Sequence, residues 1–170
     1  MKKARRMVDI VVDDDLDEDF EPPERIEEAV SAACTVAGRE ARNVDVCIRF
    51  SSDEVIQALN LQWRGRDRVT DVLSFPMQET PYDFSESLGD IALAVPFIMQ
   101  EADRLGLPAA DHCLHLIIHA VLHLLGYDHM DDDDAVAMQT LEREAMRRMG
   151  LHAPYPEAVL TNRNNAEECP

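Results

Sequence analysis

Positive charge is scarce in this sequence. Its 170 residues include 16 Lys and Arg against 34 Asp and Glu, which gives a formal net charge of −18. Such an excess of acid disfavours non-specific binding to nucleic acids. Lysine occurs only at Lys2 and Lys3, so any phosphate contact rests mainly on arginine, whose guanidinium forms bidentate bonds to phosphates. A nucleic acid could therefore be held only at a local basic patch.

Long apolar runs and paired cysteines are also absent. No continuous apolar run reaches the roughly 18 residues that suggest a membrane span. The basic start, residues 1–6, is followed by a short strand-like stretch and then by acids, not by the apolar region of a signal peptide, so we expect a cytoplasmic protein. The sequence contains no CxxC pair, which predicts reduced thiols and no cysteine zinc site. The four cysteines are Cys34, Cys47, Cys113 and Cys169.

Length and patterning predict the fold class. An apolar content of 46% fits a globular protein. We expect a single domain over residues 1–152 and a flexible polar tail over 153–170. Strands and helices mix without strict alternation, which favours an α+β fold with a small mixed sheet of about four strands and about five helices. Strands are predicted at 7–12, 44–50, 71–75 and 89–95, and helices at 22–38, 53–63, 96–106, 109–125 and 131–149.

Local signals predict where the helices begin. Two prolines at 22–23 are expected to open the first helix, since proline suits a first helical turn. Ser51 or Ser52 can cap the second helix. The acids at 131–134 can cap the last helix and favour the positive end of its dipole. The predicted core face of that last helix is Val136, Met138, Leu141, Ala145 and Met149.

Three histidines near the end of the fourth predicted helix have the spacing of metal ligands. His119 and His123 are four residues apart, so on a helix they share one face. Gly126 can take the left-handed conformation that ends a helix, and the chain can return His129 to the same point. Three protein ligands leave a fourth position open, which is the arrangement of a catalytic zinc ion.

His115 extends the same stripe by one more turn and leaves two possible ligand pairs. Eight residues of helix separate the Cα atoms of His115 and His123 by about 12 Å, so those two cannot share an ion. The pair is therefore His115 with His119 or His119 with His123. We favour the second pair because only it is followed by a glycine turn and a returning histidine. His115 would then support a ligand or pack in the core; ordinary packed histidines are the simplest alternative for the whole stripe.

The spacing of the three histidines also matches the HExxHxxGxxH motif of metzincin proteases. In that motif a glutamate after the first histidine acts as the general base. Here the corresponding residue is Ala120. A methyl group cannot activate water, so the sequence argues against peptide hydrolysis by this mechanism while the metal ligands remain.

A loop at 64–70 concentrates the positive charge that is scarce elsewhere. It contains Arg64, Arg66 and Arg68, which could bind backbone phosphates. Considered without any relative, these arginines are more simply explained as a surface loop paired with Asp67 and Asp71.

Four stretches of the chain resemble one known family. They are HAVLHLLGYDH at 119–129, NLQWRGRD at 60–67, TDVLSFP at 70–76 and GDI at 89–91. In this order they resemble the YbeY endoribonucleases, bacterial rRNA maturation factors. The resemblance implies a metal-dependent endoribonuclease specific for single-stranded RNA, with roles in maturation of the 16S rRNA 3′ end and in ribosome quality control. It implies the small ribosomal subunit or ribosomal proteins as partners, and neither DNA nor a membrane.

The resemblance also implies residue roles. Arg64 corresponds to the family's functional arginine, and we predict that it is catalytic. Arg66 and Arg68 extend its loop as candidate substrate-binding residues. The predicted ligands of one zinc ion per chain are His119, His123 and His129. Two positions depart from the family pattern, Ala120 in place of glycine and Val69 in place of proline; both affect packing more than chemistry.

Several roles remain open at this point. Asp128 could orient a histidine or simply shape the turn, and Trp63 and Tyr127 could stack on bases, although packing is favoured for both. The attacking group is either metal-bound water or the ribose 2′-OH. Two other classes compete: a zinc metallohydrolase acting on peptides or small molecules, and a non-catalytic ribosome-associated factor that carries zinc.

Overall fold

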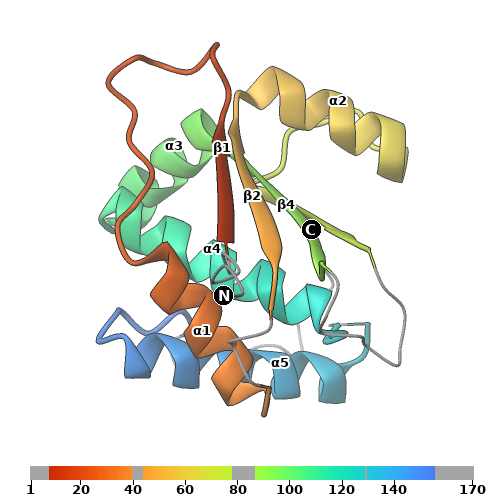
Figure 1. Ribbon diagram of the computed structural model, residues 1–170, viewed down its shortest axis with the longest axis vertical. Helices are drawn as coiled ribbons and strands as arrows, with labels where there is room; N and C mark the ends of the chain where they lie inside the picture. Colours follow the sequence, from red (N-terminus) through yellow and green to blue (C-terminus); the bar gives the residue numbers. More distant parts are fainter. Residues whose placement is uncertain (1–7, 40–43, 78–86, 129, 156–170) are drawn as a thin grey trace, which may run out of the picture.

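The computed structural model describes residues 8–39, 44–77, 87–128 and 130–155. Over these residues the chain forms four strands and five helices (Figure 1). In chain order they are β1 Val8–Val12, α1 Ile26–Val36, β2 Val46–Ser51, α2 Asp53–Arg64, β3 Val72–Pro76, β4 Gly89–Ala94, α3 Val95–Leu105, α4 Ala109–Leu124 and α5 Asp132–Arg148. The predicted α+β class is confirmed, and most element ends fall within one or two residues of those predicted.

The four strands form one mixed sheet in the order β1-β2-β4-β3. β1 pairs with β2 and β2 with β4 in parallel, whereas β3 runs antiparallel to β4. Gly89 opens β4 opposite Pro76 with φ 144°, and a Cβ atom there would overlap the carbonyl oxygen of Phe75. A glycine is therefore needed for β3 to approach β4 this closely. β3 is left as an edge strand of the sheet.

Helix α4 is the central element of the molecule. It packs against β3 and β4 on one side and against α1 and α5 on the other, while α2 contacts β4 and α3 (Figure 1). Because it is covered on several sides, apolar residues occur all around it. Five of its side chains are wholly buried, each contributing about 1.5–3 kcal/mol by leaving water. They are Ile117, Ile118, Val121, Leu122 and Leu124.

The start of α1 differs from the prediction. The prolines at 22–23 do not open the helix, which begins at Ile26. Arg25, the residue before it, has the left-handed φ of 69°, which is incompatible with a preceding helical turn. Its guanidinium donates a hydrogen bond to the carbonyl oxygen of Met149 at 2.8 Å. This contact with the end of α5 accounts for the position at which the chain enters α1.

Helix α5 begins as predicted but presents a different face to the core. Asp131 caps it by accepting a hydrogen bond from the backbone N–H of Asp134 at 2.8 Å, just as Ser52 caps α2. Val136, however, is 57% exposed, so its predicted place in the core is wrong. Residues two positions apart on a helix point about 200° away from each other, so Val136 cannot share a face with the buried Met138.

Some predictions fall on residues that the structure does not describe. His129, Cys169 and residues 156–170 of the predicted tail lie outside the described ranges. Within those ranges Cys34, Cys47 and Cys113 are free thiols. No single described helix is long and apolar enough to cross a membrane; α3 and α4 satisfy that test only together, as a pair bent by 114°.

Candidate metal centre and basic loop

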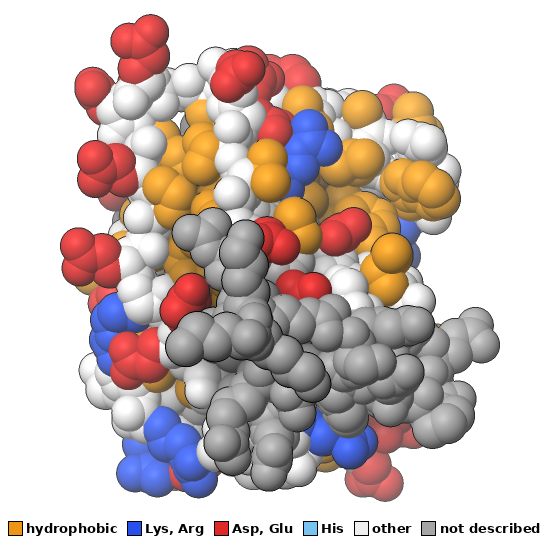
Figure 2. Space-filling view, viewed as in Figure 1, with side chains coloured by type: hydrophobic (Ala, Val, Ile, Leu, Met, Phe, Trp, Pro, Cys, Tyr) orange, Lys and Arg blue, Asp and Glu red, His pale blue; other side chains and the backbone are white. Residues whose placement is uncertain are grey.

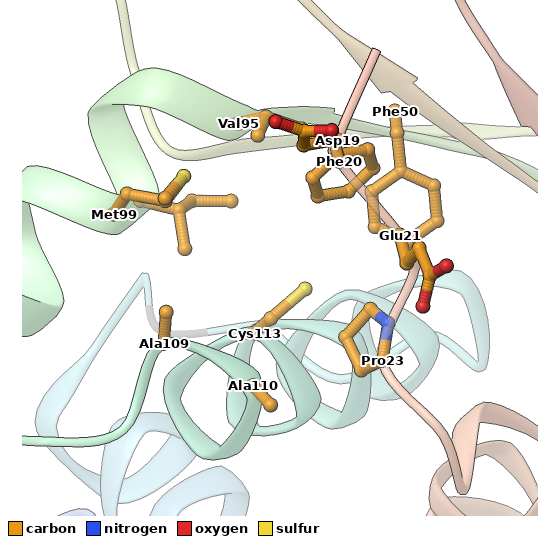
Figure 3. Close-up of a pocket in the computed structure, with 11 residues that line it drawn as sticks. Asp19, Phe20, Glu21, Pro23, Phe50, Val95, Met99, Ala109, Ala110 and Cys113 are labelled. Atoms are coloured by element: carbon orange, nitrogen blue, oxygen red, sulfur yellow. The ribbon is translucent and has the colours of Figure 1, made fainter. Parts of the chain in front are cut away.

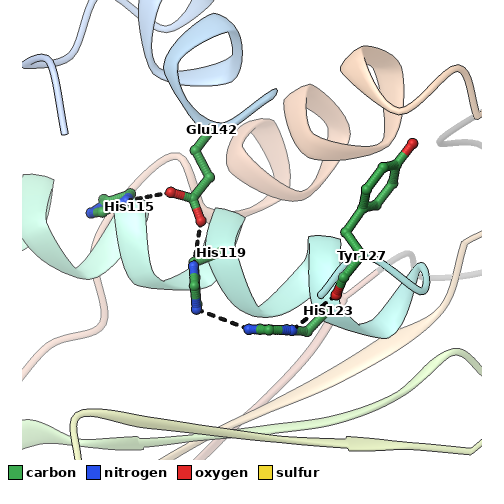
Figure 4. Close-up of polar contacts among 5 residues, drawn as sticks. All are labelled: His115, His119, His123, Tyr127 and Glu142. Atoms are coloured by element: carbon green, nitrogen blue, oxygen red, sulfur yellow. Dashed lines mark hydrogen bonds and ion pairs between the residues drawn. The ribbon is translucent and has the colours of Figure 1, made fainter. Parts of the chain in front are cut away.

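Two of the predicted ligands, His119 and His123, lie one turn apart near the end of α4. Their Nε2 atoms face each other at 3.0 Å, and their ring planes are nearly perpendicular, at 85° (Figure 4). His119 is 22% exposed, so the pair is accessible from outside the core. Two nitrogens bound to one tetrahedral zinc ion would lie about 3.3 Å apart. The observed separation therefore fits a shared ion.

The other ring nitrogens of this pair are held by acceptors. His123 Nδ1 donates to the carbonyl oxygen of Tyr127 at 3.0 Å, and His119 Nδ1 donates to a carboxylate oxygen of Glu142. A neutral imidazole with its proton on Nδ1 has a lone pair on Nε2. Both lone pairs then point into the same space, where a cation would satisfy them. This donor set fits a zinc ion, which binds neutral imidazole nitrogens.

Glu142 of α5 is a functional candidate that our sequence analysis missed. It is wholly buried, and its second carboxylate oxygen accepts a hydrogen bond from His115 Nε2 at 3.3 Å. Burial alone would raise the pKa of Glu142, but the hydrogen bonds from His115 and His119 reverse that effect and hold the pKa well below its ordinary value. In the sequence, Glu142 could have been noticed as an acid on the core face of an amphipathic helix, four residues after Met138 and three before Ala145.

A small cavity of about 190 Å³ adjoins His119 on the side of α3 and β3. Burial, and then the charge of Glu101, raise the pKa of Asp71. Glu101 accepts a hydrogen bond from His112 Nε2 at 2.7 Å, which lowers the pKa of this glutamate. Val72 and His115 contribute further lining. The cavity therefore presents carboxylates and imidazoles next to one proposed ligand.

A larger cavity of about 330 Å³ lies elsewhere, between the segment that follows β1 and helices α3 and α4 (Figure 3). Phe20, Phe50 and Met99 line it, with Asp19 at its edge. Cys113 also lines it, but burial raises the pKa of this thiol to about 12, so it is not a ready nucleophile.

Figure 2 shows acidic side chains spread over one face of the molecule with apolar side chains exposed between them.

Arg64 is the last residue of α2 and lies at the edge strand of the sheet. Its guanidinium Nη2 donates to the carbonyl oxygen of Ser74 in β3 at 3.2 Å. Val72, two residues earlier in β3, lines the same cavity as His119. Strand β3 therefore contacts Arg64 and also contributes Val72 to the lining of the cavity beside His119.

The rest of the basic loop is exposed and braced by α2. Arg66 and Arg68 are both exposed, and the carbonyl oxygen of Arg68 accepts a hydrogen bond from the side chain of Asn60 at 2.9 Å. Asp67, one of the expected charge partners, accepts a hydrogen bond from Gln57 at 2.9 Å. These contacts fix the backbone of the loop and leave the guanidinium groups at the surface.

Trp63 precedes Arg64 and is 64% exposed, so it is not buried in the core. Its ring contacts Phe75 edge-on, with centroids 6.4 Å apart. Tyr127 is partly buried against the main core. Asp128 is exposed. Among the described residues, which exclude His129, no group of three or more His, Cys, Asp or Glu side chains forms a complete metal site.

Known proteins similar to this chain cover most of its length. A family model described as Endoribonuclease YbeY matches residues 13–150. Endoribonuclease YbeY of Maricaulis maris is 43% identical over 150 residues, covering 88% of this chain and 91% of the relative. Endoribonuclease YbeY of Paracoccus denitrificans is 40% identical over 165 residues, covering 92% and 94%.

Similarity extends to a solved structure. The solution structure of a Thermotoga maritima protein matches with a TM-score of 0.54 and 25% sequence identity, over 85% of this chain and 92% of that one. The match of the family model to residues 13–150 and the identity of the curated relatives establish membership. This chain belongs to the YbeY endoribonuclease family.

Proposed function

We propose that this protein is a metal-dependent endoribonuclease that cleaves single-stranded RNA and acts in rRNA processing, at the 3′ end of 16S rRNA, and in ribosome quality control. Family membership supports cleavage of RNA. The observation that carries the metal dependence is the pair of Nε2 atoms of His119 and His123, 3.0 Å apart, with both Nδ1 atoms engaged by acceptors. The expected place of action is the cytoplasm.

One zinc ion is the proposed cofactor, held by His119 and His123 together with His129. Zinc supplies Lewis-acid polarisation of a phosphoryl oxygen and lowers the pKa of bound water toward 7. Glu142 lies on the Nδ1 side of His119, away from the facing Nε2 atoms, so it is not placed to act as a general base there (Figure 4). In this proposal His119 and His123 bind and orient the zinc ion, and Glu142 supports His119 from its Nδ1 side.

Arg64 is the proposed catalytic cation. A guanidinium stabilises the negative charge that grows on phosphate oxygens in the transition state. Its hydrogen bond to Ser74 fixes one end of the group at β3, while the side chain remains exposed to substrate. The exposed ring of Trp63 next to it offers a stacking surface for a base. Arg66 and Arg68 would extend contacts along the RNA backbone.

The charge of the chain supports the need for a partner. A net charge of −18 repels the RNA backbone except at the short arginine loop. We therefore propose that the small ribosomal subunit, or one of its proteins, brings the RNA to the site. The competing peptide hydrolase has no support at Ala120, which is 1% exposed and carries no basic group.

The experiment measures metal content and RNA cleavage on the same preparations. Purified wild-type protein should contain about one zinc ion per chain and cleave a single-stranded oligoribonucleotide but not its duplex. His119→Ala, purified in parallel, should lose both zinc and cleavage. Equal cleavage by both preparations would indicate a contaminating nuclease and overturn the proposal. Turnover of peptides that survives Arg64→Ala would favour the metallohydrolase instead.

A further inference from the structure

Helix α5 carries one acidic residue, Glu142, on its buried face. Glu142 is wholly buried between the last helix and α4, and its neighbours on that face, Met138 and Ala145, are also buried. An ionised carboxylate away from water is costly unless its oxygens are hydrogen-bonded. Both oxygens of Glu142 are bonded, and both partners are histidines of α4. An apolar residue would pack at this place without that cost, so the carboxylate points to a role beyond packing.

The two oxygens of Glu142 contact histidines with different positions relative to the candidate metal site. One oxygen accepts from Nδ1 of His119, whose Nε2 faces His123 (Figure 4). The other accepts from Nε2 of His115 at 3.3 Å. An ionised carboxylate only accepts hydrogen bonds, so it fixes the proton of His119 on Nδ1 and leaves the lone pair on Nε2. This is the tautomer that a metal-binding imidazole needs in this orientation.

His115 has a supporting place in the same chain of contacts. Its Nε2 is directed at Glu142, and its ring lies edge-on to Tyr155 with centroids 5.7 Å apart. It is 12% exposed, whereas Glu142 is not exposed at all. His115 therefore anchors one carboxylate oxygen of Glu142 while the other oxygen accepts from His119.

We propose that Glu142 is a positioning residue for metal binding: it fixes the tautomer and ring orientation of His119 and, through its negative charge, makes that imidazole a stronger ligand, while His115 anchors the carboxylate. This inference rests on the metal site of the proposed function. Carboxylates that accept the second N–H of a metal-binding histidine typically change metal affinity by about 10- to 100-fold.

The test compares two isosteric substitutions on full-length protein. Glu142→Gln removes the charge and keeps the shape. Glu101→Gln is the matched control, because Glu101 also accepts a hydrogen bond from a histidine of α4, His112, which is not one of the facing pair. Zinc affinity is measured by competition with a chromophoric chelator. We expect Glu142→Gln to bind zinc about 10- to 100-fold more weakly and Glu101→Gln to bind it as the wild type does.

A second measurement needs neither zinc nor activity. Two-bond ¹H–¹⁵N correlation spectra of metal-free wild-type protein should show His119 as the Nδ1–H tautomer, and Glu142→Gln should populate the Nε2–H tautomer as well. An Nε2–H tautomer of His119 in the wild type would overturn the inference, as would unchanged zinc affinity in Glu142→Gln. If wild-type protein binds no zinc, the proposed function fails. The spectra still decide whether Glu142 sets the tautomer in that case.

Discussion

The guanidinium of Arg64 donates a hydrogen bond to the carbonyl oxygen of Ser74 at 3.2 Å, joining the end of α2 to the outer strand β3. β3 also packs against α4, which carries the histidine pair. The basic group and the candidate metal site are therefore fixed relative to one strand, although Arg64 and His119 are 55 residues apart in the chain.

Replacing Arg64 should impair catalysis more than metal binding. Arg64→Ala is expected to lower kcat by about 100- to 1,000-fold, the range for removing one group that stabilises transition-state charge, with zinc content unchanged. Single-turnover cleavage of a single-stranded oligoribonucleotide measures the effect. Arg147→Ala is the matched control, since Arg147 is an exposed arginine that pairs with Glu144 on α5. Equal losses in both variants would assign the effect to general charge instead of to the position of Arg64.

Replacing His123 separates a catalytic metal from a structural one. His123→Ala is expected to lose zinc and more than about 100-fold of the activity, beyond the range for residues that only support a ligand. The protein should stay folded, because α4 is held by its buried apolar side chains. Circular dichroism and thermal melting of the metal-free variant provide the check. Collapse of the fold would favour the non-catalytic, zinc-bearing factor.

Removing the exposed ring of Trp63 should weaken RNA binding with little effect on folding. Trp63→Ala is expected to cost about 1–3 kcal/mol of binding free energy, the range for one base stacked on an aromatic ring. Trp63→Phe keeps an aromatic face and should recover most of the affinity. Fluorescence anisotropy with a labelled oligoribonucleotide measures both variants. A drop in melting temperature that matches the loss of affinity would indicate a packing role through Phe75.

Salt should suppress cleavage of free RNA steeply. The logarithm of the binding constant should fall with the logarithm of salt concentration, by about 0.7 for each phosphate neutralised on a single strand. Cleavage rates at subsaturating RNA, measured across a salt series, give the slope. Arg66→Ala should reduce the magnitude of that slope by about 0.7, the value for one phosphate contact. A rate independent of salt would contradict binding through the arginine loop.

The hydrogen bond between His112 and Glu101 should contribute stability that depends on pH. The hydrogen bond from His112 lowers the pKa of Glu101 below its ordinary value of 4.5. The unfolded state therefore binds more protons than the folded state below about this pH, so stability falls as pH falls through the lowered pKa. Urea unfolding from pH 6 to pH 3 should show a smaller decline in Glu101→Gln than in the wild type. An identical decline would mean that the pair is not linked to folding.

Local sequence signals were sufficient to predict much of this fold. The cap at Ser52 and the apolar run of α4 depend on neighbouring residues, so the pattern alone placed both elements. Glu142 was missed because its meaning depends on His119, 23 residues away on another helix. The left-handed Arg25 was missed for the same reason, since Met149 is 124 residues away. The role of His129 stays a prediction.

The contact between His119 and Glu142 also determines when the site can be completed during protein synthesis. The histidine pair lies on α4, whereas the carboxylate that accepts from His119 lies on α5, the last described helix. A chain translated only as far as α4 already contains His119 and His123 but has no Glu142 behind them. The complete arrangement therefore exists only after α5 has been made and has docked, so an incomplete nascent chain cannot carry the assembled site.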